Sequence, residues 1–150
     1  MHPRRLILEQ LKDLLATDNY FKSVAIRRLR PAQKSYPAVT LYCAGETNEN
    51  MTIHPGPRPQ DRNLNINIVV WEREDTNGEA TESKLDIATA HVESAIAEGY
   101  NSNQIWAIGL TDTVFDDPGE LEISEDMLRT VTLVYRYSYS TTEGQIVALP

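Results

Sequence analysis

The sequence has little of what builds a metal or catalytic site. It contains one cysteine, Cys43, and three histidines, His2, His54 and His91, which are scattered along the chain. Because zinc sites need Cys or His ligands at short, regular spacings, the sequence predicts no metal and no cofactor. It also lacks a nucleophile placed near a base and a glycine-rich phosphate loop, so we expect a protein that is not an enzyme.

The single cysteine excludes a disulfide within the chain, and its place in an alternating apolar run favours a buried, reduced side chain. An intracellular origin is therefore expected. No apolar run approaches the roughly 20 residues of a membrane-spanning helix. The apolar residues near the N-terminus are interleaved with Glu9, Lys12 and Asp13, unlike those of a signal peptide. We expect no membrane partner.

The charge is uneven along the chain. Lys and Arg number 14 against 22 Asp and Glu, a formal net charge of −8, which argues against a protein that grips nucleic acid. Basic residues cluster between Lys22 and Lys34, and acidic residues cluster between Asp112 and Asp126. These clusters are either two solvated faces or the two halves of a contact between copies, which closes into a ring or continues as a filament. The candidate interface residues are Arg27, Arg28 and Arg30 on one side and Asp116, Asp117, Glu120 and Glu122 on the other.

Hydrophobic periodicity predicts two helices. The first carries its apolar face at positions 7, 8, 11, 14 and 15, with Pro3 suited to the first turn. The second begins at Ser83, where Asp86 completes a capping-box pattern, and ends at Gly99.

Alternating patterns predict strands at 24–29, 39–43, 64–71, 105–115 and 131–139, the last with Tyr135, Tyr137 and Tyr139 on one face. At 150 residues the chain fits one domain. We expect this domain to span residues 1–140 and residues 141–150 to form a flexible tail.

A polar, proline-containing stretch from Gly45 to Asn63 shows no period of its own and is expected to be a long loop. Connections longer than about 12 to 15 residues are uncommon inside a compact domain and usually bind something or are disordered. We expect this loop to reach a partner or a neighbouring copy. The residues expected to make this contact are Met51, Ile53, His54, Arg58 and Arg62.

Several strings, taken in order, resemble the tail terminator family of long-tailed bacteriophages, the minor tail protein U type. They are the N-terminal RRLILEQLKDLLA, the proline-led strand Tyr36–Tyr42 that reaches Gly45 and Glu46, the alternating strand Leu64–Trp71, the helix opening at Ser83–Asp86, and the closing strand from Asp126 to Tyr139. The resemblance covers nearly the whole chain. The chain departs from the family in a longer loop before Asn63 and an extended end after Ser140.

The resemblance implies an α/β (α+β) fold with two helices on a mixed, largely antiparallel sheet. It implies a homo-oligomeric ring, a hexamer, that caps the phage tail tube, stops tube polymerisation and offers a surface to the head-tail connector protein. DNA would pass through the lumen only in transit, and the protein would be assembled in the host cytoplasm and located in the virion tail. Two alternatives stay open: a head-tail joining or neck protein, and a small enzyme or ligand-binding domain that uses His54, His91 and the acidic turn.

Overall fold

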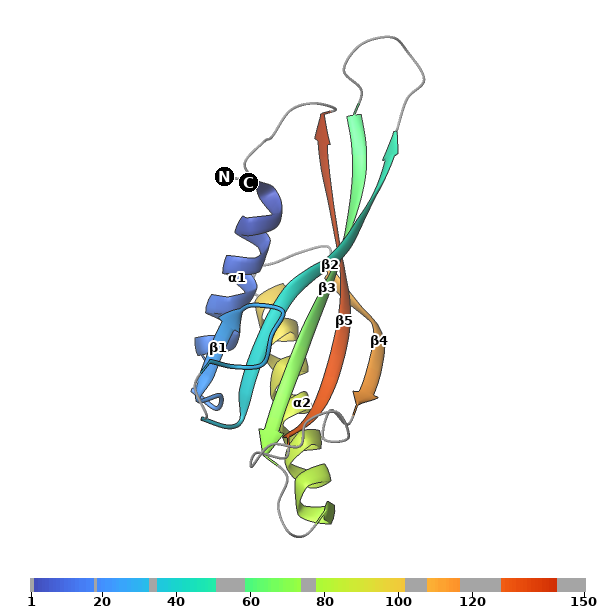
Figure 1. Cartoon of the computed structure of the whole chain (residues 1–150). Helices are drawn as coiled ribbons and strands as arrows, with labels where there is room; N and C mark the ends of the chain where they lie inside the picture. Colours follow the sequence, from blue (N-terminus) through green and yellow to red (C-terminus); the bar gives the residue numbers. More distant parts are fainter. Residues whose placement is uncertain are drawn as a thin grey trace.

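The computed structural model describes residues 2–17, 19–32, 35–50, 59–73, 78–101, 108–116 and 128–142. Two helices and five strands follow one another along the chain (Figure 1). They are α1 (Pro3–Thr17), β1 (Ser23–Ile26), β2 (Ala38–Asn50), β3 (Pro59–Arg73), α2 (Gly78–Asn101), β4 (Ile108–Asp116) and β5 (Leu128–Thr142). The predicted α+β class, with two helices on a mixed and mainly antiparallel sheet, is confirmed.

The sheet has the strand order β1-β2-β3-β5-β4. Only the β1–β2 pair is parallel, and the other three pairs are antiparallel. The short β1 therefore forms one edge of the sheet and the longer β4 forms the other. Figure 1 shows these two strands on opposite sides of the sheet.

Both helices cover the same face of the sheet. The core combines Ile7, Leu11 and Leu15 of α1 with the inward positions of the strands, such as Leu41 and Ile66, which are fully buried. On β5, Val131, Leu133, Tyr135, Tyr137 and Tyr139 are all buried, which confirms the face predicted for this strand. Alternation in the sequence identified this face because only one side of the sheet meets the helices.

Helix α1 agrees with its predicted pattern, and Arg5 forms an ion pair with Glu9 one turn later, at 2.7 Å. The predicted bounds of the second helix are wrong at both ends. Thr81 and Gly99 are buried and extend the buried stripe that runs from Leu85 to Ile96 by about one turn in each direction. Packing along this stripe therefore outweighs the capping signal at Ser83 and the stop signal at Gly99.

The expectation of one loop from Gly45 to Asn63 is wrong. Residues 45–50 continue β2 and residues 59–63 begin β3, and these segments pair in register, with Thr47 opposite Asn63 and Asn50 opposite Gln60. Of the expected loop, residues 51–58 lie outside the part of the chain that the structure describes. The two paired segments are polar on both faces, so they lack the alternation of apolar and polar residues that predicts a strand.

The strand predicted over residues 24–29 ends at Ile26, and Leu29 is 70% exposed. Because β1 and β2 are parallel, the chain must return along the sheet between them. Arg27–Ala32 belong to this return segment and lie against Trp71, on the face opposite the helices. The parallel pair thus places the basic cluster on the outer face of the sheet.

Candidate assembly surfaces

Three strands extend beyond the part of the sheet that the helices cover (Figure 1). This projecting part consists of residues 45–50 of β2, 59–63 of β3 and 138–142 of β5, and we call it the arm. It begins at a bulge between Cys43 and Gly45, where the register of β2 against β3 shifts by one residue. Bulges bend a strand and increase its twist, which suits the change of direction at this point.

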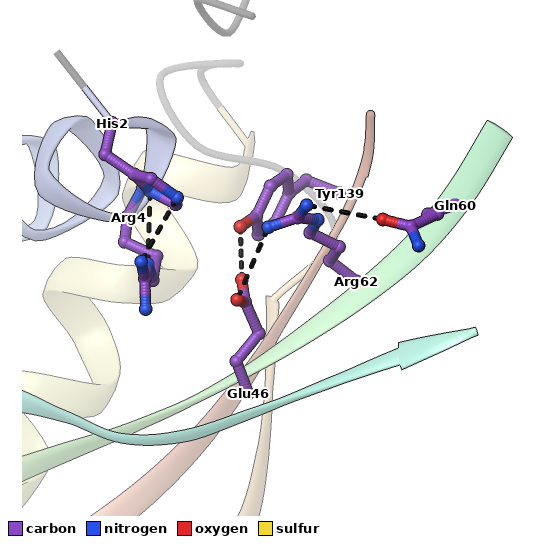
Figure 2. Close-up of polar contacts among 6 residues, drawn as sticks. All are labelled: His2, Arg4, Glu46, Gln60, Arg62 and Tyr139. Carbon is purple, nitrogen blue, oxygen red and sulfur yellow. Dashed lines mark hydrogen bonds and ion pairs between the residues drawn. The ribbon is translucent and has the colours of Figure 1, made fainter. Parts of the chain in front are cut away.

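A cluster of polar side chains occupies the base of the arm on the helix side (Figure 2). The Tyr139 hydroxyl donates a short hydrogen bond to Glu46, and Arg62 Nη1 lies 3.6 Å from Glu46 Oε2. Arg62 Nη2 also donates to Gln60 Oε1 at 3.3 Å. The cluster therefore joins side chains from β2, β3 and β5.

The cluster is shielded from solvent, since the side chains of Glu46 and Arg62 are only 11% and 17% exposed. Burial, together with the hydrogen bond to Glu46, raises the pKa of Tyr139 to about 12. The hydroxyl therefore stays protonated and remains a donor at neutral pH. Charged hydrogen bonds in partly buried sites are stronger than those between neutral groups, so this cluster stiffens the base of the arm.

The N-terminus of α1 lies beside this cluster (Figure 2). The Arg4 backbone N–H and its Nε each donate to His2 Nδ1 at 3.1 Å. Burial and the charge of Arg4 both lower the pKa of His2. The start of α1 thus places His2 and Arg4 near Glu46.

Side chains on the opposite face of the arm also bridge strands. Ser138 Oγ donates to Asn63 Oδ1 at 2.7 Å, and Ser140 Oγ donates to Asp61 Oδ1 at 3.0 Å. Both bridges join β5 to β3 and are exposed to solvent. The arm is polar on its two faces and cross-linked on each, which is unlike a sheet that buries one side in its own core.

The basic cluster is anchored to the outer face of the sheet. Arg28 Nη2 donates to the Cys43 carbonyl oxygen at 2.7 Å, and the guanidinium carbon lies 4.9 Å from the centre of the Tyr42 ring. Trp71 Nε1 donates to Thr40 Oγ1 at 2.8 Å. A shallow hollow of about 550 Å³ lies between Trp71 and the segment Arg27–Ala32. Arg28 thus fixes the return segment, while Leu29 and Arg30 are exposed beside it.

The acidic half of the predicted contact lies mostly outside the described chain. Asp117, Glu120 and Glu122 belong to the stretch 117–127, and Asp116 is placed only as the last residue of β4. The pairing of these residues with the arginines stays a prediction. The same holds for the tube-contact candidates Met51, Ile53, His54 and Arg58, which lie in the undescribed stretch 51–58.

The histidine at position 91 has a packing role. Its ring stacks on Tyr20 with centroids 3.8 Å apart and planes 10° from parallel.

The Cys43 thiol is half-buried, and burial raises its pKa, so it forms the reactive thiolate less readily than a free cysteine. Within the described residues, no group of His, Cys, Asp and Glu side chains could hold a metal ion.

Sequence analysis missed a second surface, at the β4 edge. Phe115 is 72% exposed, and Leu110 and Val114 of the same strand are also exposed. A hollow of about 170 Å³ lies between β4, the start of β5 and the start of α2, and it is lined by Glu82, Leu85, Asp86, Phe115, Arg129 and Thr130. No pattern in the sequence indicates this hollow, because it forms between segments that are far apart in the chain.

The similarity of this chain to known proteins lies in its structure. No protein family model matches the sequence, and no curated protein matches it. Among solved structures, the chain is similar to one in the virion of a native gene transfer agent particle, with 11% identity, a TM-score of 0.42, and 89% of this chain and 92% of that chain covered.

A second similar chain comes from the sheath/tube terminator, in its extended state, of an extracellular contractile injection system. It shows 10% identity and a TM-score of 0.43, and the match covers 96% of this chain but 59% of that chain.

Among the described helices, none is long and apolar enough to cross a membrane.

Proposed function

We propose that this chain is a structural tail terminator, which forms a ring on the end of a phage or prophage tail tube. The ring stops tube polymerisation and offers its other rim to the head-tail connector. The order of sequence motifs suggests this role, and the virion and the sheath/tube terminator that contain the two similar chains are compatible with it. Because their identity and TM-score are low, those structures are not evidence for the proposal.

The observation that carries the proposal is the arm. Three paired strands project beyond the helix-covered body, and their polar side chains are bridged to one another on both faces. A projection of this kind contributes little to its own hydrophobic core, so its stiffening is better explained by contact with another molecule. We assign the arm to the contact with the tube protein or with a neighbouring copy.

The unlike sides of the sheet support the proposed ring. The β1 side carries the basic return segment and the β4 side carries exposed apolar residues with carboxylates nearby. Unlike surfaces at opposite edges make a head-to-tail contact, which closes into a ring when the rotation between copies allows. A closed ring has two different rims, so one rim can match the tube while the other rejects further tube subunits. In this role the protein is not an enzyme, and DNA only passes through the lumen.

The proposed assembly has a defined place. Copies synthesised in the host cytoplasm would form a hexamer from a single domain that includes β5 up to Thr142, and would end in the virion tail. Sedimentation and negative-stain images of the purified protein test the ring directly. We expect an annulus, and a protein that stays monomeric at high concentration contradicts the proposal.

A second experiment tests the arm. Residues 51–58 are replaced by Asn-Gly, a two-residue turn that suits a hairpin, so that β2 and β3 stay joined. Asp13→Ala, an exposed change on α1, is the control. The shortened protein should still form annuli but fail to halt the growth of uncapped tubes, whereas the control should halt them. Normal termination by the shortened protein would remove the arm tip from the proposal.

A further inference from the structure

The surface beside β1 presents an isolated apolar side chain between two cations. Leu29 is 70% exposed and is flanked in sequence by Arg28 and Arg30, which are also exposed. Arg28 is held by the Cys43 carbonyl oxygen, so this part of the return segment has a fixed position on the sheet. Covering such an exposed leucine side chain with another surface is favourable, because apolar area is removed from water.

The hollow between α2 and β4 is complementary to this surface in polarity and charge. Leu85 and Phe115 supply its apolar lining, and the exposed carboxylates of Glu82 and Asp86 lie at its border. Arg129 Nη2 lies 3.8 Å from Glu82 Oε1. The charged side chains that line the hollow are two carboxylates and one guanidinium, so their net charge is negative.

The two surfaces also agree in size. The hollow measures about 170 Å³. Apolar cavities of about 150 Å³ accommodate a benzene ring, and the leucine side chain has fewer carbon atoms than benzene. Within one copy the two surfaces cannot meet, because the return segment lies on the face of the sheet opposite the helices and the hollow lies on the helix-covered face, between α2 and β4 (Figure 1).

We infer that Leu29 of one copy inserts into the hollow between α2 and β4 of the next copy, with Arg30 placed against Asp86 and Glu82. The occupant of the hollow is a second copy of this chain. The inference rests on the proposed ring and names the contact between its neighbours. It places the acidic side of that contact on α2, in addition to the acidic residues after β4 that the sequence suggested.

Disulfide cross-linking tests this contact. Leu29→Cys and Phe115→Cys are combined in a Cys43→Ser background, where the new thiols can bond only between copies. Each single-cysteine variant is one control, and Leu29→Cys with Asp13→Cys, on the exposed side of α1, is the matched pair. We expect a ladder of cross-linked oligomers from the first pair only, and Leu29→Asp should weaken self-association about 10- to 100-fold.

Charge exchange adds a second readout. Arg30→Glu alone and Asp86→Arg alone should each weaken association, and the two together should restore it at low salt. Annuli without a ladder and without charge rescue would overturn this contact but leave the terminator proposal intact. Absence of any oligomer would overturn both. Annuli that give the ladder, and that Leu29→Asp dissolves, support both.

Discussion

Strand β3 passes through two different environments. Its middle lies in the hydrophobic core that stabilises the fold, and its start lies in the arm, which we expect to contact a partner. Its middle residues, Leu64, Ile66 and Ile68, are fully buried under the helices. Its first residues lie on the arm, where Arg62 is bonded to Glu46 and Gln60 instead of to apolar neighbours. The body is held by apolar packing and the arm by hydrogen bonds and charge, so the two should respond differently to mutation.

The largest effect is expected in the body. Ile66→Ala removes a fully buried side chain and should lower the free energy of unfolding by about 2–5 kcal/mol. The neighbouring Asn65→Ala, on the other face of the same strand, should cost less than about 1 kcal/mol. Urea unfolding of both variants measures the difference. Equal costs would mean that the two faces of β3 are not as different as their burial indicates.

A smaller and local effect is expected in the arm. Tyr139→Phe deletes the hydroxyl that binds Glu46 and should cost about 1 kcal/mol. Amide hydrogen exchange should accelerate in residues 45–50 and 59–63 while the amides of the body keep their rates. Tyr135→Phe is the control, because it removes the corresponding group from the helix-covered part of β5. Uniform acceleration throughout the sheet would show that arm and body open together.

The arm should also weaken at high pH. The pKa of Tyr139 is raised from 10.0 to about 12, so the folded protein keeps a proton that the unfolded chain has lost. The contribution of this group is therefore complete below pH 10 and is lost as the pH rises toward about 12. Unfolding free energies of the wild type and Tyr139→Phe, measured across this interval, should converge. Parallel curves would rule out the Tyr139 hydroxyl as the cause.

The smallest effect is expected at the other end of β3. Glu72 is 6% exposed, and burial raises its pKa. A raised pKa means that protonation favours the folded state, so the charged form costs stability at neutral pH. Glu72→Gln should raise the melting temperature slightly at pH 7 and lose this advantage in acid. A decrease at pH 7 would show that the carboxylate has a favourable partner that outweighs its burial.

The predictable parts of the fold are those where one face is buried. Alternation identified Val131, Leu133 and the three tyrosines of β5, and the 3.6-residue period identified α1, because burial imposes these patterns on the sequence. The β2 and β3 segments of the arm, residues 45–50 and 59–63, were expected to be a loop because they lack the alternation of apolar and polar residues. Its strands form because they continue the ladders of the apolar part of the sheet, which a local pattern does not show.

The candidate surfaces were predictable only in part. A run of arginines in the sequence indicated a basic patch, but its position on the outer face depends on the parallel pairing of β1 with β2. No local signal distinguishes a parallel from an antiparallel partner. Leu29 was expected inside a strand, and its exposure follows from the end of β1 at Ile26.

The bulge in β2 controls which way the arm residues point. Cys43 pairs with Ile66, and Gly45 pairs with Asn65, so Ala44 is the extra residue. In a strand, successive side chains alternate between faces, and a shift of one position reverses all of them. If Ala44 instead paired with Asn65 in a regular ladder, Glu46 would lie opposite Asn63 and face solvent, away from Arg62 and Tyr139, while the body kept its register. One extra residue thus decides which face of the sheet Glu46 and the rest of the arm segment of β2 point to.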